Sequence, residues 1–179
     1  MIRNASKPIR PLRIVWIAVN NMKSALTTRR LRLSVLIVVL AALFITDAWS
    51  KAFALGRGEQ DWTLIPGVLR WELTHNTGIA FGLPLVSWFF WALIPVLIGG
   101  LGYAAYKKYR QGRFFELVAL GGIIVGALGN IVDRLRYGAV IDFLHITYWH
   151  VFNLADVYIT VGVVGLIISM LYEKKIPKT

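Results

Sequence analysis

The chain has 179 residues, of which 57% are hydrophobic and 16% are charged, whereas an ordinary soluble domain has about 25% charged residues. This composition, with a mean hydropathy of +0.62, argues against a soluble protein and predicts one small integral membrane domain. The chain contains no cysteine, which excludes disulfides, thiolate catalysis and cysteine-ligated metal sites.

The first 32 residues are basic and contain no acidic residue. Within them, residues 11–19 (PLRIVWIAV) are apolar but too short to span a bilayer. Two interpretations stay open. Either this stretch lies in the membrane interface with Trp16 at headgroup level, or residues 1–32 are a basic tail without fixed structure. Both make residues 1–32 a cytoplasmic extension of a membrane domain at residues 33–172, which a cytoplasmic tail follows at residues 173–179.

Four apolar stretches are predicted to span the membrane. The first, residues 33–53, exceeds the roughly 20 residues that a crossing needs. It has no clear small-residue cleavage site, so we interpret it as a retained span and not as a signal peptide. The others lie at about residues 85–106, 114–133 and 157–172. Between the first two, residues 54–82 are predicted to fold outside the membrane, with short strands at 63–65 and 68–73 around a Pro66-Gly67 turn.

The positive charges predict how the spans are oriented. Four spans place both termini and the loop at residues 107–113 on one side, which then carries 15 of the 20 Lys and Arg residues. By the positive-inside rule, both termini are cytoplasmic. The net charge of +11 therefore reflects the topology, with basic residues that contact anionic lipids, and it does not indicate a nucleic-acid partner.

Polar and ionisable residues gather at the outer ends of these spans. Such groups are costly at membrane depth, so a cluster of them indicates a functional site. In chain order they are Asp47, Lys51, Asn76, Asn130, Asp133, Arg134, Asp142, Asn153 and Asp156.

Some of these residues have a structural interpretation. Asp47 and Lys51 lie four residues apart and are predicted to support each other as a pair near the interface. Asn130 and Arg134 share a helix face for the same reason, while Asp133 is predicted to form an ion pair with the neighbouring Arg134.

Three glycines of the third span, Gly122, Gly126 and Gly129, lie at near-helical spacing. This pattern is typical of close helix–helix packing. We expect it to let the other spans approach and bring their polar residues together.

Asp142 lies in an apolar, β-like stretch at residues 138–146 (GAVIDFLHI), where an acid has no local structural role. If the chain returns Asp142 to Asp156, the two carboxylates share a proton and their pKa values separate. One carboxylate then activates water while the other protonates the carbonyl or the leaving amine. Such a pair suits amide hydrolysis without a metal or a covalent intermediate. For Asn153 and Asp156, a helix N-terminal cap is an equally good interpretation.

Other chemistries fit less well. Ser50 and Lys51 are adjacent and do not face each other on a helix, which disfavours a Ser/Lys dyad. The three histidines lack the spacing of an HExxH zinc site. The competing function is a small ion-coupled transporter or proton-relay module. Against it, the polar residues gather at one face of the membrane. A structural assembly factor would leave Asp142 unexplained.

Four motifs, in this order, resemble those of lipoprotein signal peptidase (signal peptidase II), a bacterial inner-membrane aspartyl peptidase family. The resemblance covers about residues 33–172. The motifs are DAWSK (47–51), NTGIAFG (76–82), GGIIVGALGNIVDRLRYGAVIDF (121–143) and FNLAD (152–156).

The resemblance implies an all-α membrane fold of four transmembrane helices with a small periplasmic β-cradle. It implies that Asp142 and Asp156 are the catalytic dyad. Side chains that bind substrate or orient the dyad would be Asn76, Asn130, Arg134 and Asn153, and structural support would come from Asp47, Lys51, Asp133 and the three glycines.

It also implies cleavage of diacylglyceryl-modified prolipoproteins before the lipidated cysteine, without a metal or other cofactor, and inhibition by globomycin. The partners would be these substrates and membrane lipids, and the protein would be a monomer with its active site near the periplasmic face. Two features depart from the family pattern. The basic N-terminal extension is long, and the segment between Asp142 and Asp156 is short, which trims the loop beside the site.

Overall fold

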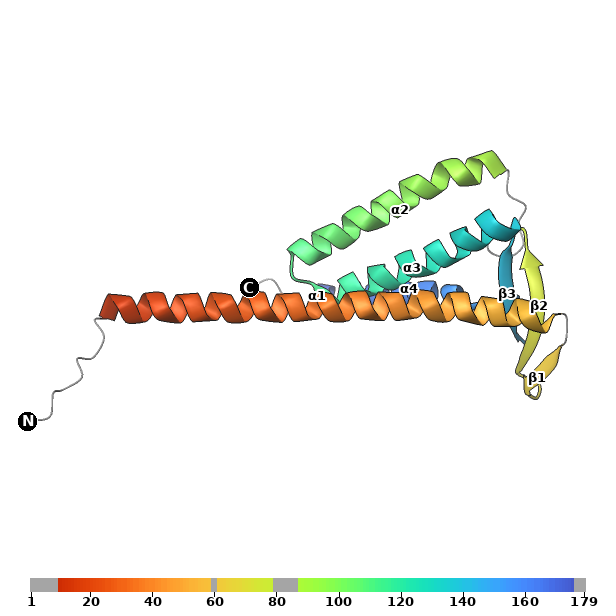
Figure 1. The fold of residues 1–179 in the computed structure, drawn as a ribbon, viewed down its shortest axis with the longest axis horizontal. Coiled ribbons are helices and arrows are strands. Elements are labelled where there is room, and N and C mark those ends of the chain that lie inside the picture. The colour runs from red at the N-terminus through yellow and green to blue at the C-terminus, as the bar shows by residue number, and fades with distance from the viewer. Residues whose placement is uncertain (1–9, 59–60, 79–86, 176–179) are drawn as a thin grey trace, which may run out of the picture. The chain divides into compact units, whose positions relative to one another are not determined.

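The computed structural model describes residues 10–58, 61–78 and 87–175. It forms two compact units, Met1–Val38 and Val39–Thr179, and the sheet and the candidate site belong to the second. The elements follow one another along the chain as α1 (Arg10–Arg57), β1 (Trp62–Ile65), β2 (Leu69–Asn76), α2 (Ser87–Arg110), α3 (Phe114–Tyr137), β3 (Val140–Ile146), β4 (Val151–Phe152) and α4 (Leu154–Lys175) (Figure 1).

The first helix is longer than the predicted span that it contains. Its backbone is helical from Arg10, so the interpretation of residues 1–32 as a tail without fixed structure is wrong for residues 10–32. The sequence offers a physical reason, because residues 12–55 contain neither proline nor glycine. Pro11 lies in the first turn, where its missing N–H group costs no intrahelical hydrogen bond. Gly58, with a φ of 68°, follows the helix in the left-handed conformation that commonly ends helices.

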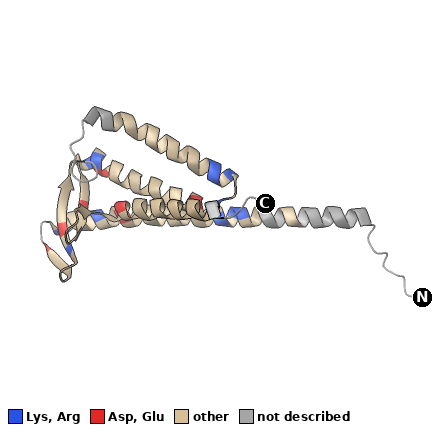
Figure 2. Ribbon diagram, turned by 180° about the vertical axis from the view of Figure 1, so that it is seen from behind, with Lys and Arg blue, Asp and Glu red and all other residues tan. Residues whose placement is uncertain are grey.

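Three helical stretches of the described residues are long and apolar enough to cross a membrane, namely Leu26–Arg57, Phe114–Tyr137 and Leu154–Glu173. They coincide with three of the four predicted spans. The remaining one, at about residues 85–106, begins outside the described residues and continues into α2, so its crossing stays a prediction. Figure 2 shows basic residues at the end of α2, where Lys107, Lys108 and Arg110 occupy the last turn. The orientation of the termini also stays a prediction.

The four strands form one antiparallel sheet in the order β1-β2-β3-β4. The predicted turn at Pro66-Gly67 is confirmed, since the Val68 N–H group donates to the Ile65 carbonyl over 3.0 Å. Gly67 has a φ of 72°. Proline followed by a glycine with positive φ is the pattern of a type II turn.

Strand β3 (Val140–Ile146) covers all but the first two residues of the β-like stretch predicted at residues 138–146. It pairs with β2, which places Thr74 opposite Asp142 and Asn76 opposite Val140. This register was not predicted, because the sequence indicated β2 only as far as residue 73. Because β2 extends as far as Asn76, the Asn76 side chain reaches Asp142 on the neighbouring strand β3.

A buried cluster joins the end of α1 to the sheet. It consists of Ala54 on α1, Trp71 on β2, and Ile141 and Phe143 on β3. The rings of Trp71 and Phe143 have centroids 4.8 Å apart. Because side chains alternate between the two faces of a strand, burying Ile141 and Phe143 against this cluster turns Asp142 to the opposite face. The alternation therefore aims the acid away from the apolar core of the sheet.

Glycines let α3 approach its neighbours closely. A Cβ atom at Gly126 would overlap the carbonyl oxygen of Ala155 on α4, and one at Gly129 would overlap the carboxylate of Asp47 on α1. The predicted close packing is therefore confirmed at Gly126 and Gly129. At Gly122 the nearest atom is the carbonyl oxygen of Tyr158 at 3.7 Å, which is ordinary contact.

We expect Gly126→Ala to lower the free energy of unfolding by about 1–3 kcal/mol, because α3 and α4 must separate to admit the methyl group. Gly102→Ala on α2 is the matched control, since a Cβ there meets nothing within 4 Å. This control is expected to raise stability by roughly 0.5–1 kcal/mol through helix propensity. Denaturant titration in mixed micelles measures both. Equal effects of the two substitutions would contradict the close packing of α3 on α4.

Candidate active site

Lys51 binds two carboxylates from different helices. Its Nζ atom lies 2.8 Å from Oδ2 of Asp47, one turn earlier on α1, and 2.8 Å from Oδ2 of Asp133 on α3. The three side chains are at most 7% exposed. The predicted Asp47–Lys51 pair is confirmed. The ion pair predicted for Asp133 with Arg134 is wrong, because Asp133 pairs with Lys51; successive side chains on a helix point in different directions.

The two carboxylates also fix backbone atoms near the site. Oδ1 of Asp47 accepts a hydrogen bond from the N–H group of Ala155 in the first turn of α4, at 2.9 Å. Oδ2 of Asp133 accepts from the N–H group of Ile141 on β3, at 3.3 Å. The buried charge cluster therefore ties α1 and α3 to the elements that carry Asp142 and Asp156.

Asn153 and Asp156 cap the N-terminus of α4. The Asn153 side-chain oxygen accepts from the Asp156 N–H group at 3.1 Å, and Oδ2 of Asp156 accepts from the Asn153 N–H group at 3.3 Å. This reciprocal pattern is that of a capping box, so the cap interpretation is confirmed. It leaves Nδ2 of Asn153 and Oδ1 of Asp156 available for the site.

Three asparagines hold the two aspartates by donating to them. Nδ2 of Asn153 donates to Oδ1 of Asp142 at 2.7 Å, and Nδ2 of Asn76 donates to Oδ2 of Asp142 at 3.0 Å. Nδ2 of Asn130 donates to Oδ1 of Asp156 at 2.8 Å. Because Asn153 is hydrogen-bonded to both aspartates, the structure brings Asp142 and Asp156 to one site.

Further contacts orient these amides. Oδ1 of Asn130 accepts from Nζ of Lys51 and from Nδ2 of Asn153, each at 3.0 Å. Its Nδ2 group is thereby directed to Asp156. Oδ1 of Asn76 accepts from the Gly78 N–H group at 3.0 Å, which directs the Asn76 Nδ2 group to Asp142 in the same way.

Arg134 lies at the edge of this network. Its Nη2 atom donates to the Gly78 carbonyl oxygen at 2.7 Å, and its Nη1 atom donates to the Asn130 carbonyl oxygen at 3.4 Å. The guanidinium therefore joins α3 to the segment that follows β2. The carbonyl of Gly78 is a contact that the sequence did not indicate, because no side chain signals it.

The environment of Asp142 changes its proton affinity. Burial is the main reason that the pKa of Asp142 is raised from its ordinary value of 3.8 to about 6, and the negative charge of Asp156 contributes to the rise. The hydrogen bonds that Asn76 and Asn153 donate act in the opposite direction. Asp142 is therefore the carboxyl that retains a proton at a pH where an exposed aspartate is ionised.

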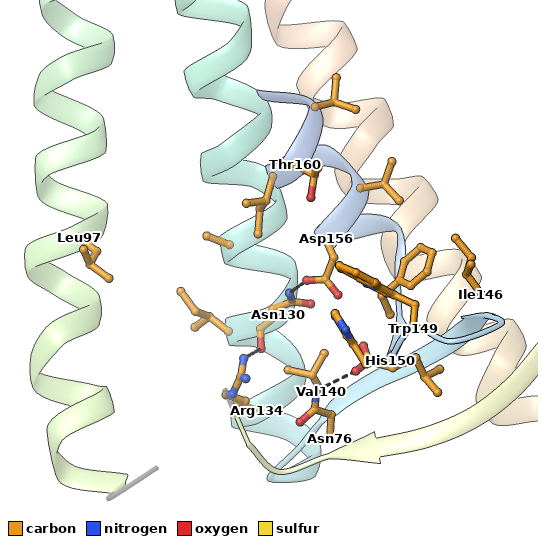
Figure 3. A pocket seen from close by; sticks show the side chains of 18 of the residues that line it. Asn76, Leu97, Asn130, Arg134, Val140, Ile146, Trp149, His150, Asp156 and Thr160 are labelled. Carbon is orange, nitrogen blue, oxygen red and sulfur yellow. Dashed lines mark hydrogen bonds between the residues drawn. The ribbon is translucent and has the colours of Figure 1, made fainter. Parts of the chain in front are cut away.

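A cavity of about 1120 Å³ opens beside the aspartates, between α2, α3, α4 and the β3–β4 turn. Asp142 lines it. So do Asn76, Asn130, Arg134 and Asp156, which Figure 3 labels. Most of the remaining wall is apolar and comes from three helices, with Ile94, Leu97, Ile98 and Leu101 on α2, Ala127 and Ile131 on α3, and Val157 and Val161 on α4. The arrangement places the carboxyl groups of Asp142 and Asp156 beside a space that a large apolar ligand fits.

The signal peptidase (SPase) II family model matches residues 39–172 of this chain. The lipoprotein signal peptidase of Pseudomonas paraeruginosa is 36% identical over 149 residues, with 76% of this chain and 88% of that protein covered. That of Deinococcus radiodurans is 37% identical, with 79% and 81% covered. That of Burkholderia thailandensis is 44% identical, with 74% and 81% covered.

Solved structures show the same fold. One, described as a bacterial membrane enzyme determined by the in meso method at 2.3 Å resolution, matches with a TM-score of 0.71 and 26% identity. The match covers 79% of this chain and 90% of that chain. A second such structure, at 1.9 Å resolution, matches with a TM-score of 0.67 and 26% identity, covering 77% and 93%.

Proposed function

This chain belongs to the signal peptidase II family, and we propose that it removes signal peptides from diacylglyceryl-modified prolipoproteins by cleaving before the lipidated cysteine. The observation that carries the proposal is the pair Asp142 and Asp156, joined through Asn153 at the end of an apolar cavity. We infer an aspartic mechanism in which no covalent intermediate forms.

In this mechanism Asp156 acts as the general base and takes a proton from a water molecule, whose oxygen attacks the scissile carbonyl carbon. Asp142, whose pKa is raised to about 6 by burial, gives its proton to the carbonyl oxygen. The resulting gem-diol collapses when Asp156 returns its proton to the amide nitrogen and Asp142 recovers one from a hydroxyl group. The carbon–nitrogen bond breaks and leaves a carboxylic acid and a free amine, with both aspartates restored.

The asparagines supply the geometry for these steps. Four N–H groups point at the carboxylates, from the side chains of Asn76, Asn130 and Asn153 and from the Asn153 backbone. Donors that are fixed in advance stabilise the charge that moves between the aspartates without reorganising during the reaction. Asn76, Asn130, Arg134 and Asn153 are therefore proposed to orient the dyad or to bind the substrate.

The cavity suits a substrate that arrives through the bilayer. A lipidated cysteine with two acyl chains, following a hydrophobic signal segment, needs an apolar surface at membrane depth, and the walls of α2, α3 and α4 supply one. We propose that α2 completes four spans in a membrane domain at residues 33–172, after the extension at residues 1–32. Both termini would then be cytoplasmic, and the aspartates of this monomer would lie near the periplasmic face of the inner membrane.

The test is cleavage of a diacylglyceryl-modified prolipoprotein by the purified protein in detergent, with a chelator present. Mass spectrometry of the products should find a new N-terminus at the lipidated cysteine. The same precursor without the lipid is the control and should remain intact. Absence of cleavage by a folded protein, or cleavage at another bond, would contradict the proposal and favour a proton-relay function.

A further inference from the structure

Thr160 on α4 carries a hydroxyl group that makes no hydrogen bond to the described residues. Hydroxyl groups in membrane helices usually bond back to a carbonyl of the preceding turn. Thr46 on α1 does so, donating to the Ala42 carbonyl at 2.8 Å and the Leu43 carbonyl at 3.0 Å. Ser169, further along α4, donates to Oε1 of Glu116 at 2.8 Å. Thr160 has no hydrogen-bond partner among the residues that the structure describes.

This hydroxyl group lies within the cavity that contains the aspartates. Thr160 lines the cavity one helical turn after Asp156, and Figure 3 shows it on the same stretch of α4. Residues four apart on a helix share a face and are separated by about 6 Å along the axis. The neighbouring wall residues Val157 and Val161 are apolar. The Thr160 side chain is exposed, so a ligand that enters the cavity can bring an acceptor to its hydroxyl group.

The proposed substrate has an acceptor within reach of this position. The scissile amide nitrogen belongs to the lipidated cysteine, whose sulfur carries a glycerol with two fatty-acid esters. A signal segment in helical form satisfies its own backbone carbonyls, as any helix in a bilayer must. The ester carbonyls have no such internal partner. They lie a few covalent bonds from the scissile bond, and this linkage is long enough to span one helical turn.

Resting on the proposed function, we propose that Thr160 donates a hydrogen bond to an ester carbonyl of the diacylglyceryl group and thereby determines specificity for acyl esters. Because the bond is present both before and during the reaction, it contributes to binding and is expressed in KM. A net contribution typical of one hydrogen bond corresponds to about 3- to 10-fold in affinity.

Two substrates with the same peptide test this inference, one with a diacyl (ester) glyceryl group and one with a dialkyl (ether) glyceryl group of equal chain length. The parent protein should have a KM about 3- to 10-fold lower for the ester substrate. Thr160→Val, which replaces only the hydroxyl by a methyl group, should bring the ratio of the two KM values close to one. Thr160→Ser, which restores the hydroxyl, should recover the parental ratio.

Thr46→Val is the matched control, because its hydroxyl group is bonded within the protein and should not affect the ester preference. The inference is overturned if Thr160→Val keeps the parental ratio, or if the parent cleaves both substrates with equal KM. A parent that cleaves neither substrate contradicts the proposed function itself, and the inference with it.

Discussion

Asp156→Asn is expected to reduce kcat for prolipoprotein cleavage by about 10²- to 10⁴-fold, the range that a positioned general base contributes. Asparagine has nearly the same shape but cannot take a proton from water. Asp142→Asn should have an effect of similar size, because its amide cannot deliver a proton to the carbonyl oxygen. Single-turnover cleavage assays with a saturating amount of enzyme measure the chemical step directly.

Loss of activity must be separated from loss of structure in these variants. Each aspartate accepts from two N–H groups, Asp142 from Asn76 and Asn153, and Asp156 from Asn130 and the Asn153 backbone. An asparagine has only one acceptor oxygen, so its NH2 group faces one of the two N–H donors. This contact between two donors lowers stability by about 1–3 kcal/mol.

Asp61→Asn is the matched control, since Asp61 is exposed outside the site. The dyad variants should melt somewhat earlier than this control, yet stay folded at the assay temperature. Cleavage that survives in either dyad variant would mean that the aspartates are assigned incorrectly.

The polar residues of the site could be predicted from the sequence, because placing an ionisable group at membrane depth costs free energy and therefore indicates a function. The turn at Pro66-Gly67 could be predicted because its two residues have few other conformations available. The length of α1 could have been predicted from the absence of proline and glycine over residues 12–55. The basic composition of residues 1–32 does not predict a helix, because it fits a tail without fixed structure equally well.

The partners of the charged residues could not be predicted in the same way. The direction in which Asp133 points depends on how α3 is rotated relative to α1, and this rotation is set by packing at Gly126 and Gly129. Sequence neighbours suggested Arg134, whereas Lys51, 82 positions away, is the residue that binds Asp133. Thr160 was missed because a threonine in an apolar helix gives no signal until its hydroxyl is found without a partner.

Lys51→Met is expected to lower the free energy of unfolding by about 3–5 kcal/mol, because it leaves two buried carboxylates without their counter-ion. Lys107→Met, which removes an exposed lysine at the end of α2, is the control and should change stability by less than about 1 kcal/mol. Denaturant titration in mixed micelles measures both.

Removing the buried charges together distinguishes charge from packing in this effect. The triple variant Asp47→Asn, Lys51→Met and Asp133→Asn should recover part of the lost stability, because no unpaired charge remains in the cluster. If the triple variant is less stable than Lys51→Met alone, the carboxylates contribute through their bonds to Ala155 and Ile141 more than through Lys51.

Activity should not return with stability in the triple variant. Nζ of Lys51 is one of two donors that hold Oδ1 of Asn130, and this fixes the amide so that its Nδ2 group faces Asp156. Without the lysine, Asn130 can rotate its amide and present an oxygen to the Asp156 carboxylate, which then loses the donor that positions it. The lysine is thus expected to serve the reaction through Asn130, in addition to holding α1 and α3 together.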